Sequence, residues 1–383
     1  MISNDLKNIL LAIEKTFPLP SRFRGVLPKD IAELSKLLTA KRGDRTLSYL
    51  NKPNFLSAYL RYYLPWNIVR LCNLLPRLDI KFNKGDIIVD LGSGPLTFAI
   101  ALWVSRPDLR NIPLEIYCID RSSAVLEAGK KLFENYCGKD GDKCNWKINL
   151  IKKSINFKNK VYIEGKDLLK KQKAKMVCAV NLFNEGYDKI AHSNTLALKH
   201  LADNIGYFLH DTASKEGVIL TVEPGIPQSG RFISFLRDAL IKNNRMPLSP
   251  CTHSQNCPFN NAGDKKRWCH FAFNTEAAPK ELLRLSALAK LPKERITYSY
   301  LFAGNNLTTE HEQKKDTLVR VISDAFSLQG GFFGRYGCCE KGLILLQGEK
   351  SQIEEISSCD LVNAVCVSQE VDKKSGALIY VKE

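Results

Sequence analysis

The sequence lacks any hydrophobic run long enough to cross a membrane. A transmembrane helix needs about 20 consecutive apolar residues, whereas the longest apolar runs, at 179–183 and 342–346, have the length of buried strands. The N-terminal stretch MISNDLKNILLAIEKTF lacks the sustained apolar segment and the small-residue cleavage site of a secretory signal, and it contains no Arg. We therefore predict a soluble protein of the bacterial cytoplasm with no membrane partner.

Acidic residues are too few to balance the basic ones. The 56 Lys and Arg residues outnumber the 40 Asp and Glu residues, which gives a net charge of +16. A charge so far from zero indicates an acidic partner, most often nucleic acid. Residues 130–175 hold fourteen Lys, five acidic residues and no Arg. This lysine-rich segment predicts either a surface that attracts phosphate or simply a solvated face, because Arg is the usual residue for bidentate phosphate contacts.

Cysteine, by contrast, is abundant, with twelve residues. Disulfides are rare in the cytosol, so clustered cysteines there favour a metal site or catalysis. Cys72, Cys118 and Cys178 lie in apolar stretches and are predicted to be small core residues.

The hydrophobic pattern changes near residue 85. Residues 1–80 are predicted to be helical, because apolar positions recur every three to four residues. Strands then alternate with helices, and the predicted strands are 86–90, 115–120, 160–165, 176–183, 217–223, 296–302 and 317–323. Such alternation predicts an α/β fold with a Rossmann-like, mainly parallel sheet.

The remaining segments are predicted to be additions to this sheet. The predicted regions are a helical N-terminal region (1–80), the first part of the core (81–228), a Cys-rich insertion (229–295), the last core strands (296–325) and a small β-rich C-terminal extension (326–383).

The stretch VDLGSGPLTFAIAL, residues 89–102, is predicted to be a strand, a glycine-rich turn and a helix. Glycines allow close backbone approach, and the helix N-terminus offers free N–H groups. Asp90, Gly92, Ser93 and Gly94 form the turn, and Asp120 ends the next strand, where an acid can accept both ribose hydroxyls. Because no G-x-x-G follows, a pyrophosphate site is not supported.

This turn and its distal acid resemble the first motifs of class I methyltransferases, with Leu96 at the position of a frequent third glycine. The resemblance implies S-adenosylmethionine as the cofactor. It places Asp120 on the ribose, Gly92 and Gly94 beneath the methionine part, and Asp167 near the adenine amino group.

The stretch NLFNE ends the predicted strand 176–183. Asn181, Asn184 and Glu185 are therefore predicted to line the substrate pocket. The stretch is not the N/D-P-P-Y motif of amino-group methyltransferases, and the sequence assigns no catalytic base.

Residues 251–271, CTHSQNCPFNNAGDKKRWCHF, hold three cysteines. The gaps of five and eleven residues between Cys251, Cys257 and Cys269 do not fit the paired spacing of a zinc knuckle. They fit the looser spacing of a [4Fe–4S] cluster better, but zinc and unligated buried cysteines both stay open. Candidates for a fourth ligand are His253, His270 and the pair Cys338-Cys339.

Several segments in order resemble the mitochondrial ribosomal small-subunit assembly methyltransferase-like proteins and their bacterial relatives. These segments are LSKLLTAKRGDR, AYLRYYLPWNIVRL, VDLGSGPLT, CIDRSS, NLFNE, VEPGIPQSG, SPCTHSQNCPF, WCHF, ITYSYLF and RYGCCEKGLILL. The resemblance implies a [4Fe–4S] cluster held by Cys251, Cys257, Cys269 and Cys338, with Cys339 as the alternative fourth ligand. His253 and His270 would then support the site without binding iron.

The resemblance also implies ribosomal RNA or the small ribosomal subunit as the partner, in ribosome assembly or translation, and a monomer off the ribosome. Three hypotheses follow: a methyltransferase of small-subunit ribosomal RNA, a weak or inactive assembly factor that binds this RNA, and a zinc-containing methyltransferase of another substrate.

Overall fold

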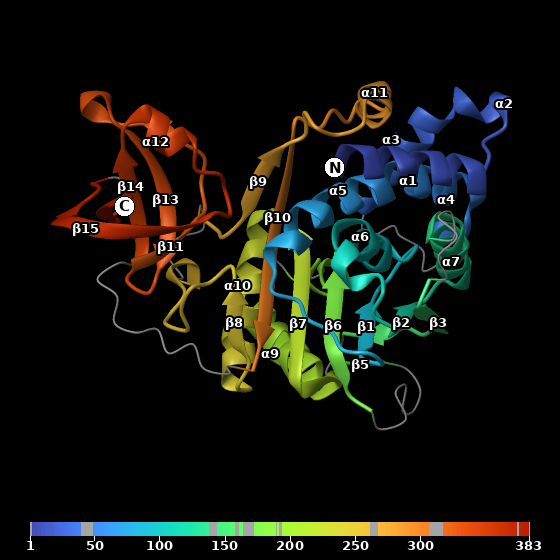
Figure 1. Cartoon of the computed structure of the whole chain (residues 1–383), viewed down its shortest axis with the longest axis horizontal. Coiled ribbons are helices and arrows are strands. Elements are labelled where there is room, and N and C mark those ends of the chain that lie inside the picture. Colours follow the sequence, from blue (N-terminus) through green and yellow to red (C-terminus); the bar gives the residue numbers. More distant parts are fainter. Residues whose placement is uncertain are drawn as a thin grey trace. The chain divides into compact units, whose positions relative to one another are not determined.

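The computed structural model describes the chain in two compact units (Figure 1). The described residues are 2–39, 49–137, 144–157, 161–163, 172–188, 190, 194–260, 267–305, 317–373 and 375–382. The first unit comprises Met1–Ala191, Thr212–Ser214 and Asn274–Ile296. The second unit comprises His192–Asp211, Lys215–Phe273 and Thr297–Glu383.

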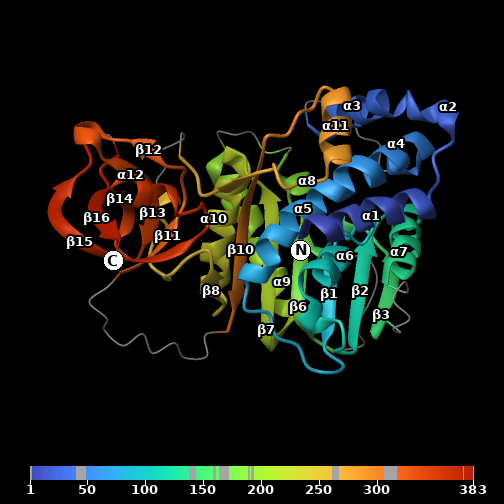
Figure 2. The same cartoon turned by 45° about the horizontal axis from the view of Figure 1, so that its top comes forward.

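The first unit begins with helices, as predicted for residues 1–80. They are α1 (Ile2–Thr16), α2 (Ser21–Arg24), α3 (Leu27–Leu38), η2 (Tyr49–Asn51), α4 (Pro53–Ala58), η3 (Tyr59–Tyr63), α5 (Leu64–Leu74) and η4 (Leu75–Arg77). The η3 segment is a π-helical turn, and Pro65, which has no backbone N–H, stands in the first turn of α5. Figure 2 shows these helices above the sheet of the same unit, where α5 packs on α6 and α1 packs on α7.

That sheet is parallel and has the strand order β3-β2-β1-β6. Its strands are β1 (Ile87–Leu91), β2 (Leu114–Asp120), β3 (Trp146–Lys152) and β6 (Ala174–Val180), and its helices are α6 (Thr97–Ser105), η5 (Pro107–Leu109), α7 (Ser123–Cys137) and α8 (Asn184–Tyr187). Every residue of β1 is buried, as expected of a central parallel strand covered on both faces. Cys72, Cys118 and Cys178 are fully buried, which confirms their prediction as core residues.

The third strand of this sheet differs from the prediction. Residues 160–165 were expected to form it, but β3 does, whereas β5 (Tyr162–Ile163) pairs only with β4 (Ile155–Asn156) in a separate two-stranded sheet. The β3 strand lies at the sheet edge and begins within the lysine-rich segment. One face of an edge strand can stay polar. The apolar residues of β3 are therefore interspersed with polar ones, and their pattern is hard to distinguish from the lysine-rich sequence around it.

The second unit contains a further set of helices and strands, apart from a few terminal residues that belong to the first unit. Its elements are α9 (Thr195–Thr212), β7 (Ala213–Pro224), α10 (Pro227–Lys242), β8 (Met246–Ser249), η7 (Pro258–Asn260), β9 (Phe271–Asn274) and β10 (Arg295–Gly304). The β10 strand lies between β7 and β8 and runs antiparallel to both. The strands expected at 217–223 and 296–302 are present.

The predicted Cys-rich insertion divides between the two units, because residues 274–296 belong to the first. These residues include α11 (Lys280–Leu288), which packs against the N-terminal helices. Trp66 Nε1 donates a hydrogen bond to Ser286 Oγ at 3.1 Å, and Tyr62 Oη donates one to the Leu291 carbonyl at 3.1 Å. Trp66 of α5 therefore contacts α11, and Tyr62 of η3 contacts the segment directly after it.

The C-terminal part of the second unit is a closed β structure. Its elements are β11 (Thr317–Val321), β12 (Phe326–Ser327), η8 (Gln329–Gly331), β13 (Phe333–Cys339), β14 (Gly342–Gly348), α12 (Lys350–Glu354), β15 (Leu361–Val371) and β16 (Leu378–Lys382). The strand order is β11-β15-β16-β14-β13-β12, and an additional pairing of β11 with β13 closes a five-stranded barrel. The predicted β-rich extension is confirmed.

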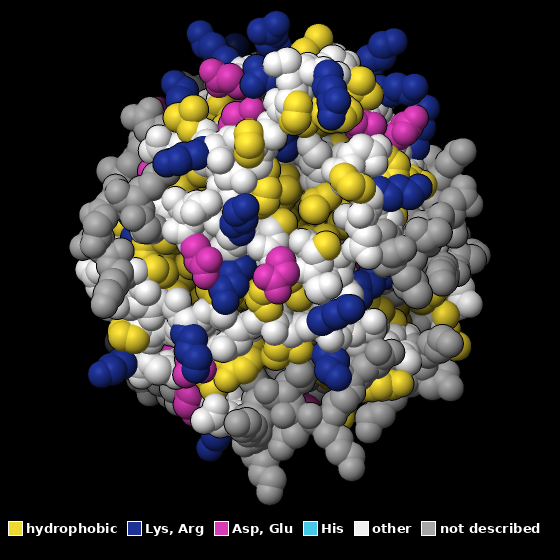
Figure 3. Space-filling view, turned by 90° about the vertical axis from the view of Figure 1, so that its right-hand side faces the viewer, with side chains coloured by type: hydrophobic (Ala, Val, Ile, Leu, Met, Phe, Trp, Pro, Cys, Tyr) yellow, Lys and Arg dark blue, Asp and Glu magenta, His cyan; other side chains and the backbone are white. Residues whose placement is uncertain are grey.

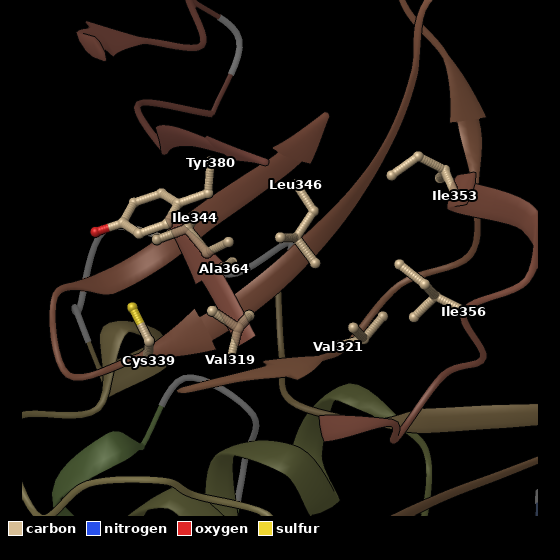
Figure 4. Packing of buried hydrophobic residues seen from close by; sticks show 9 residues of the cluster. All are labelled: Val319, Val321, Cys339, Ile344, Leu346, Ile353, Ile356, Ala364 and Tyr380. Atoms are coloured by element: carbon tan, nitrogen blue, oxygen red, sulfur yellow. The ribbon is translucent and has the colours of Figure 1, made fainter. Parts of the chain in front are cut away.

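The strand expected at 317–323 as the last core strand belongs to this barrel instead. Val319 and Val321 of β11 are fully buried in the barrel core beside Ile344 and Leu346 of β14 (Figure 4). Alternating hydrophobic residues predicted a strand here correctly, but such a pattern does not specify which sheet the strand joins.

In the described parts of the chain, none of the helices is both long and apolar enough to cross a membrane.

Candidate functional site

The turn between β1 and α6, residues 92–96, uses left-handed backbone conformations. The φ angles of Gly92, Gly94 and Leu96 are 65°, 54° and 57°. A Cβ atom on Gly92 would lie 2.7 Å from Leu182 Cδ1, so both the φ angle and the space require glycine there. Leu96 adopts the left-handed conformation at a cost of about 1–2 kcal/mol. Its side chain is fully buried, and burial of a leucine, worth about 1.5–3 kcal/mol, offsets that cost.

Ser93 fixes this turn to its surroundings. Its backbone N–H donates to the Ile119 carbonyl of β2 at 3.0 Å, and its Oγ donates to the Asp90 carbonyl at 2.9 Å. The predicted cofactor residue Ser93 is itself buried. It therefore shapes the turn from within.

Asp120 lies at the end of β2 opposite the turn, as predicted. Its Oδ2 accepts the Gly94 N–H at 3.0 Å, and its Oδ1 accepts the Ser122 N–H at 2.9 Å. Burial raises the pKa of this carboxyl, whereas the two N–H groups lower it. A carboxylate has about four acceptor positions, so Asp120 keeps capacity for a pair of hydroxyl donors.

Asp90 is buried within the sheet, and only one of its two carboxylate oxygens has a hydrogen-bond partner among the described residues. It is 1% exposed, and its Oδ1 accepts a hydrogen bond from Cys178 Sγ at 3.5 Å. Its Oδ2 is buried and has no hydrogen-bond partner among the described residues. Burial raises the pKa of Asp90 to about 7. A buried carboxylate oxygen without a donor is a position where a bound ligand could supply one.

Asn181 follows β6 and faces the N-terminal helices. It has a φ of 54°, a conformation that Asn tolerates better than most residues. Its Nδ2 donates to Asn67 Oδ1 at 3.2 Å, and Arg70 Nη1 donates to Asn67 Oδ1 at 2.8 Å and to Asn181 Oδ1 at 3.4 Å. The sequence predicted Asn181 but gave no signal that Asn67 and Arg70 join it.

Glu185 is held toward β2 by an ion pair. Its Oε2 lies 3.3 Å from Nη1 of Arg121, the residue directly after Asp120. Asn184 is buried at the start of α8.

Tyr59 of the N-terminal helices lies close to the glycine turn. Its hydroxyl is 3.9 Å from the position that a Cβ on Gly94 would occupy, and burial raises the pKa of Tyr59. The structure thus brings the predicted pocket residues Asn181, Asn184 and Glu185 to the sheet edge that carries the glycine turn, whereas the predicted adenine contact Asp167 lies outside the described residues.

The second unit holds the cysteine centre, defined here as Cys251, Cys257, Cys269 and Cys338. Arg237 of α10 organises the loop that carries the first two. Its Nη2 donates to the His253 carbonyl at 2.8 Å and to the Gln255 carbonyl at 2.6 Å, and the side chain is 3% exposed. A buried guanidinium therefore fixes the backbone between Cys251 and Cys257.

Close contacts of the backbone and of the adjacent Trp268 hold Cys269 at the cysteine centre. Its carbonyl accepts a hydrogen bond from Ser299 Oγ of β10 at 2.7 Å, and the adjacent Trp268 donates from Nε1 to the Gly225 carbonyl at 3.1 Å. A Cβ on Gly230 would lie 2.7 Å from Trp268 Cδ1 and 3.0 Å from the Cys269 carbonyl oxygen. Glycine at 230 thus lets the segment pack directly on α10.

The four thiols of the centre influence one another electrostatically. Burial raises the pKa of Cys269, and the nearby Cys251, Cys257 and Cys338 raise it further. Burial raises the pKa of Cys338, and Cys251 and Cys257 add to the effect. Burial raises the pKa of Cys251, whereas the Arg237 guanidinium lowers it. The structure therefore brings together four cysteines from three separate segments of the sequence.

Cys338, and not Cys339, faces this centre. Cys338 Sγ lies 3.7 Å from His253 Nε2. Cys339 is fully buried in the barrel core, where Figure 4 shows its sulfur below Tyr380. Successive residues of a strand point to opposite faces of the sheet, so the adjacent cysteines of β13 separate.

The two histidines near the centre differ in their contacts. Burial lowers the pKa of His253 to about 4, and the Arg237 charge adds to this shift, so His253 is neutral at pH 7. The His270 ring stacks on Trp268 with 4.8 Å between ring centroids, and its Nδ1 lies 3.1 Å from the Trp268 carbonyl. His270 thus contacts the segment that carries Cys269.

Sequence reasoning missed Arg320 and Cys359. Arg320 of β11 donates from Nε to the Pro250 carbonyl at 2.8 Å and from Nη1 to the Cys359 carbonyl at 2.7 Å. Cys359 has a φ of 78°, and its Sγ lies 3.3 Å from the Tyr300 hydroxyl. No spacing in the sequence links these positions to the loop at 251.

No group of three or more His, Cys, Asp or Glu side chains among the described residues could hold a metal ion. The four cysteine side chains are mutual neighbours without converging on one ion position. The predicted iron–sulfur cluster and its zinc alternative therefore stay predictions.

The glycine turn after β1 and the acid at the end of β2 lie at one edge of the parallel sheet of a Rossmann-like α/β fold. The family model described as "Mitochondrial small ribosomal subunit Rsm22" matches residues 80–330. This match covers more than half of the chain, and the chain belongs to that family.

Solved methyltransferase structures are only distantly similar. A phosphoethanolamine N-methyltransferase 2 from Haemonchus contortus in complex with S-adenosyl-L-methionine is 10% identical, with 71% of this chain and 66% of that chain covered and a TM-score of 0.34. A precorrin-6y C5,15-methyltransferase from Geobacter metallireducens is 12% identical, with coverages of 63% and 87% and a TM-score of 0.31. Similarity at this level carries no information about the substrate. None of the curated proteins compared with the chain matches it significantly.

Replacing Asp90 by Asn should change how stability depends on pH. The folded pKa of about 7 lies above the unfolded value, so the protonated carboxyl stabilises the fold at low pH and this contribution is lost as the pH rises toward 7. Between the unfolded pKa of about 3.9 and the folded pKa of about 7, the wild-type free energy of unfolding should fall, relative to that of the Asn variant, by about 1.4 kcal/mol per pH unit. Urea unfolding of both proteins at several pH values measures the difference. Asp79→Asn, at an exposed carboxylate paired with Lys81, is the control. A difference that does not vary with pH would contradict the buried, raised pKa.

Proposed function

We propose that the chain is an S-adenosylmethionine-dependent methyltransferase-like protein that carries a [4Fe–4S] cluster and acts on, or binds, the RNA of the small ribosomal subunit. The observation that carries the cofactor assignment is Asp120, whose carboxylate meets the Gly94 N–H across the turn between β1 and α6.

The residues of the first unit fit this cofactor. The carboxylate of Asp120 has acceptor capacity for two ribose hydroxyls, and the turn carries no side chain at Gly92 and Gly94. Asp90 Oδ2, which has no hydrogen-bond partner in the part of the chain that the structure describes, is an acceptor that a donor on the cofactor could satisfy. When bound, the cofactor supplies an electrophilic methyl group, and the chain's part is to align it with an acceptor atom.

The proposed pocket favours positioning over proton transfer. Glu185 is engaged with Arg121, and Asn181 is engaged with Asn67 and Arg70. These groups would orient a substrate by hydrogen bonds. Because none of them is a free base, a second candidate function is an assembly factor that binds RNA with weak or no methyl transfer.

Isothermal titration with S-adenosylmethionine tests the cofactor site. The folded wild-type protein should bind, and Asp120→Asn should bind about 10- to 100-fold more weakly, because a charged acceptor of hydrogen bonds is worth about 1.5–3 kcal/mol. Asp79→Asn should bind as the wild type does. Failure of the folded wild type to bind would reject the cofactor assignment, and binding without transfer of labelled methyl groups to small ribosomal subunits would favour the assembly factor.

The donor chemistry of the cysteine centre supports an iron–sulfur cluster better than zinc. The gaps of five and eleven residues between Cys251, Cys257 and Cys269 do not fit the paired spacing of a zinc knuckle. A set of four cysteines is the usual ligand set of a [4Fe–4S] cluster. Cys251, Cys257, Cys269 and Cys338 would hold the cluster. The further alternative of a zinc-containing methyltransferase has less support.

The proposed cluster has a structural role. It would join the loop at 251–257, the segment at 269 and strand β13, which come from distant parts of the sequence. Metal binding of this kind contributes folding free energy directly, because the unfolded chain has no preformed site.

Serine substitutions at the adjacent cysteines test this ligand assignment. Cys338→Ser should lose visible absorption and iron from anaerobically purified protein, because it removes a ligand. Cys339→Ser should keep both and lose about 1–3 kcal/mol of stability, because it places a hydroxyl in the apolar barrel core. Iron analysis and thermal unfolding measure the two effects. Loss of iron in Cys339→Ser but not in Cys338→Ser would contradict the assignment.

Ribosomal RNA is the proposed partner because the chain carries a net charge of +16 and belongs to a family described by a ribosomal subunit. Figure 3 shows Lys and Arg side chains spread over one face, interspersed with many apolar side chains and fewer acidic ones. Lys131, Lys147, Lys152 and Lys153 are exposed, whereas most other lysines of residues 130–175 lie outside the described residues. A monomer off the ribosome and a cytoplasmic location stay predictions, and the family description names a mitochondrial subunit.

A further inference from the structure

The C-terminal barrel has the connectivity of an oligonucleotide-binding barrel. Around the barrel the strands follow each other as β11, β13, β14, β16 and β15, and β15 closes onto β11. The β14–β16 pair is parallel, β11–β15 is antiparallel, and α12 connects β14 to β15. This arrangement is a five-stranded Greek-key barrel of the OB type, whose ligands bind across the second and third strands and the two adjoining loops.

A fold alone does not establish a ligand, so the side chains of the corresponding face decide the question. That face lies on β13 and β14. Cys339 points into the barrel core, and the neighbouring Cys338 points out of it toward the cysteine centre. Residues of one face alternate along a strand, so Phe332, Gly334 and Tyr336 share the outward face with Cys338. Phe332 has extended backbone angles immediately before β13.

Two aromatic rings stand on this outward face, defined here as the barrel face (Phe332, Gly334, Tyr336). Phe332 is 45% exposed and follows Gly330 and Gly331, which both have positive φ. Tyr336 is half-buried, and four residues of strand place it about 13 Å from Phe332. Gly334 between them is buried, and a Cβ there would lie 2.8 Å from Leu345 Cδ1 and 2.9 Å from Leu328 Cδ1, so apolar side chains cover the strand between the two rings.

The two loops of the barrel hold Tyr336 in place. The Tyr336 hydroxyl donates to Asp372 Oδ2 at 3.2 Å, in the loop before β16. The Tyr336 ring lies 5.0 Å from the ring of Phe326, which belongs to the short strand β12 in the connection between β11 and β13. Arg267, which is exposed, donates from Nη1 to the Ser375 carbonyl in the same loop as Asp372 at 3.0 Å. Arg267 is thereby tied to the loop that contacts Tyr336, and Lys373 adds a second exposed cation to this loop.

We propose that the barrel face binds a single-stranded segment of RNA, with bases stacked on Phe332 and Tyr336 and a backbone phosphate near Arg267. Aromatic stacking and adjacent cations are the means by which such barrels bind unpaired strands without reading sequence. The inference rests on the proposed function only in taking RNA as the partner. Since Cys338 ends the same face of β13, the cysteine centre would fix the orientation of this surface.

Fluorescence anisotropy of the full-length, cluster-loaded protein tests the proposal. The probes are a labelled single-stranded RNA of about 12 nucleotides, within the usual span of one such barrel, and a duplex RNA of the same length. Phe332→Ala should raise the Kd for the single strand about 5- to 100-fold, the effect of losing one base stack. Tyr207→Ala, which removes a 57% exposed aromatic side chain from α9, should leave the Kd unchanged. Because Phe332 is 45% exposed and stands just before β13, its variant should unfold close to the wild-type temperature.

The outcomes separate this inference from the proposed function. If Phe332→Ala binds the single strand as the wild type does, or if the duplex binds as tightly as the single strand, the barrel-face inference is wrong while RNA binding elsewhere survives. If the single strand binds through Phe332 but S-adenosylmethionine does not bind, the inference stands and the cofactor assignment fails. If the wild type binds neither RNA, both the inference and the proposed partner are wrong.

Discussion

The cysteine centre depends on the buried guanidinium of Arg237. A loop that carries two cysteines into the interior of the second unit buries backbone carbonyls away from water. Each buried carbonyl without a hydrogen bond would lower the stability of the fold. Arg237 satisfies the carbonyls of His253 and Gln255. Its positive charge also favours the thiolate form of Cys251, against the opposing effect of burial. Since a metal binds cysteine as thiolate, the same side chain that shapes the loop would prepare its chemistry.

In the first unit, the backbone conformation of the turn after β1 shapes the candidate cofactor site. Three left-handed residues bend the chain sharply after β1, and Asp120 accepts the Gly94 N–H that this bend exposes. The strands β1 and β2 pair in parallel and end side by side. Asp90 of β1 has one carboxylate oxygen with no hydrogen-bond partner among the described residues. A buried polar group in this state is consistent with a site whose binding partner is a ligand.

Sequence reasoning predicted the parts of the molecule that depend on local patterns. The strands β1, β2 and β6 are rich in apolar residues, and the glycines of the turn and Asp120 lie where motif spacing placed them. The strand β3 was missed because a polar edge strand resembles its lysine-rich surroundings, and β11 was assigned to the wrong sheet because alternation does not identify a pairing partner. The spacing of Cys251, Cys257 and Cys269 indicated a shared site, but only the pleat of β13 separates Cys338 from Cys339.

The contacts that support each site could not be predicted, since they join distant segments. Arg237, Arg320 and Arg121 belong to ordinary helix, strand and turn sequences, and only the tertiary fold brings them to His253, Pro250 and Glu185. The proposed cluster connects such distant segments in the same way, from the loop after β8 to the barrel strand β13. On this account the cluster supports both the second unit and the barrel face.

The most direct test of this account is the metal and sulfide content of anaerobically purified wild-type protein. The account predicts about four iron and about four acid-labile sulfide per folded chain, with no stoichiometric zinc. One zinc per chain, with neither iron nor sulfide, would contradict it.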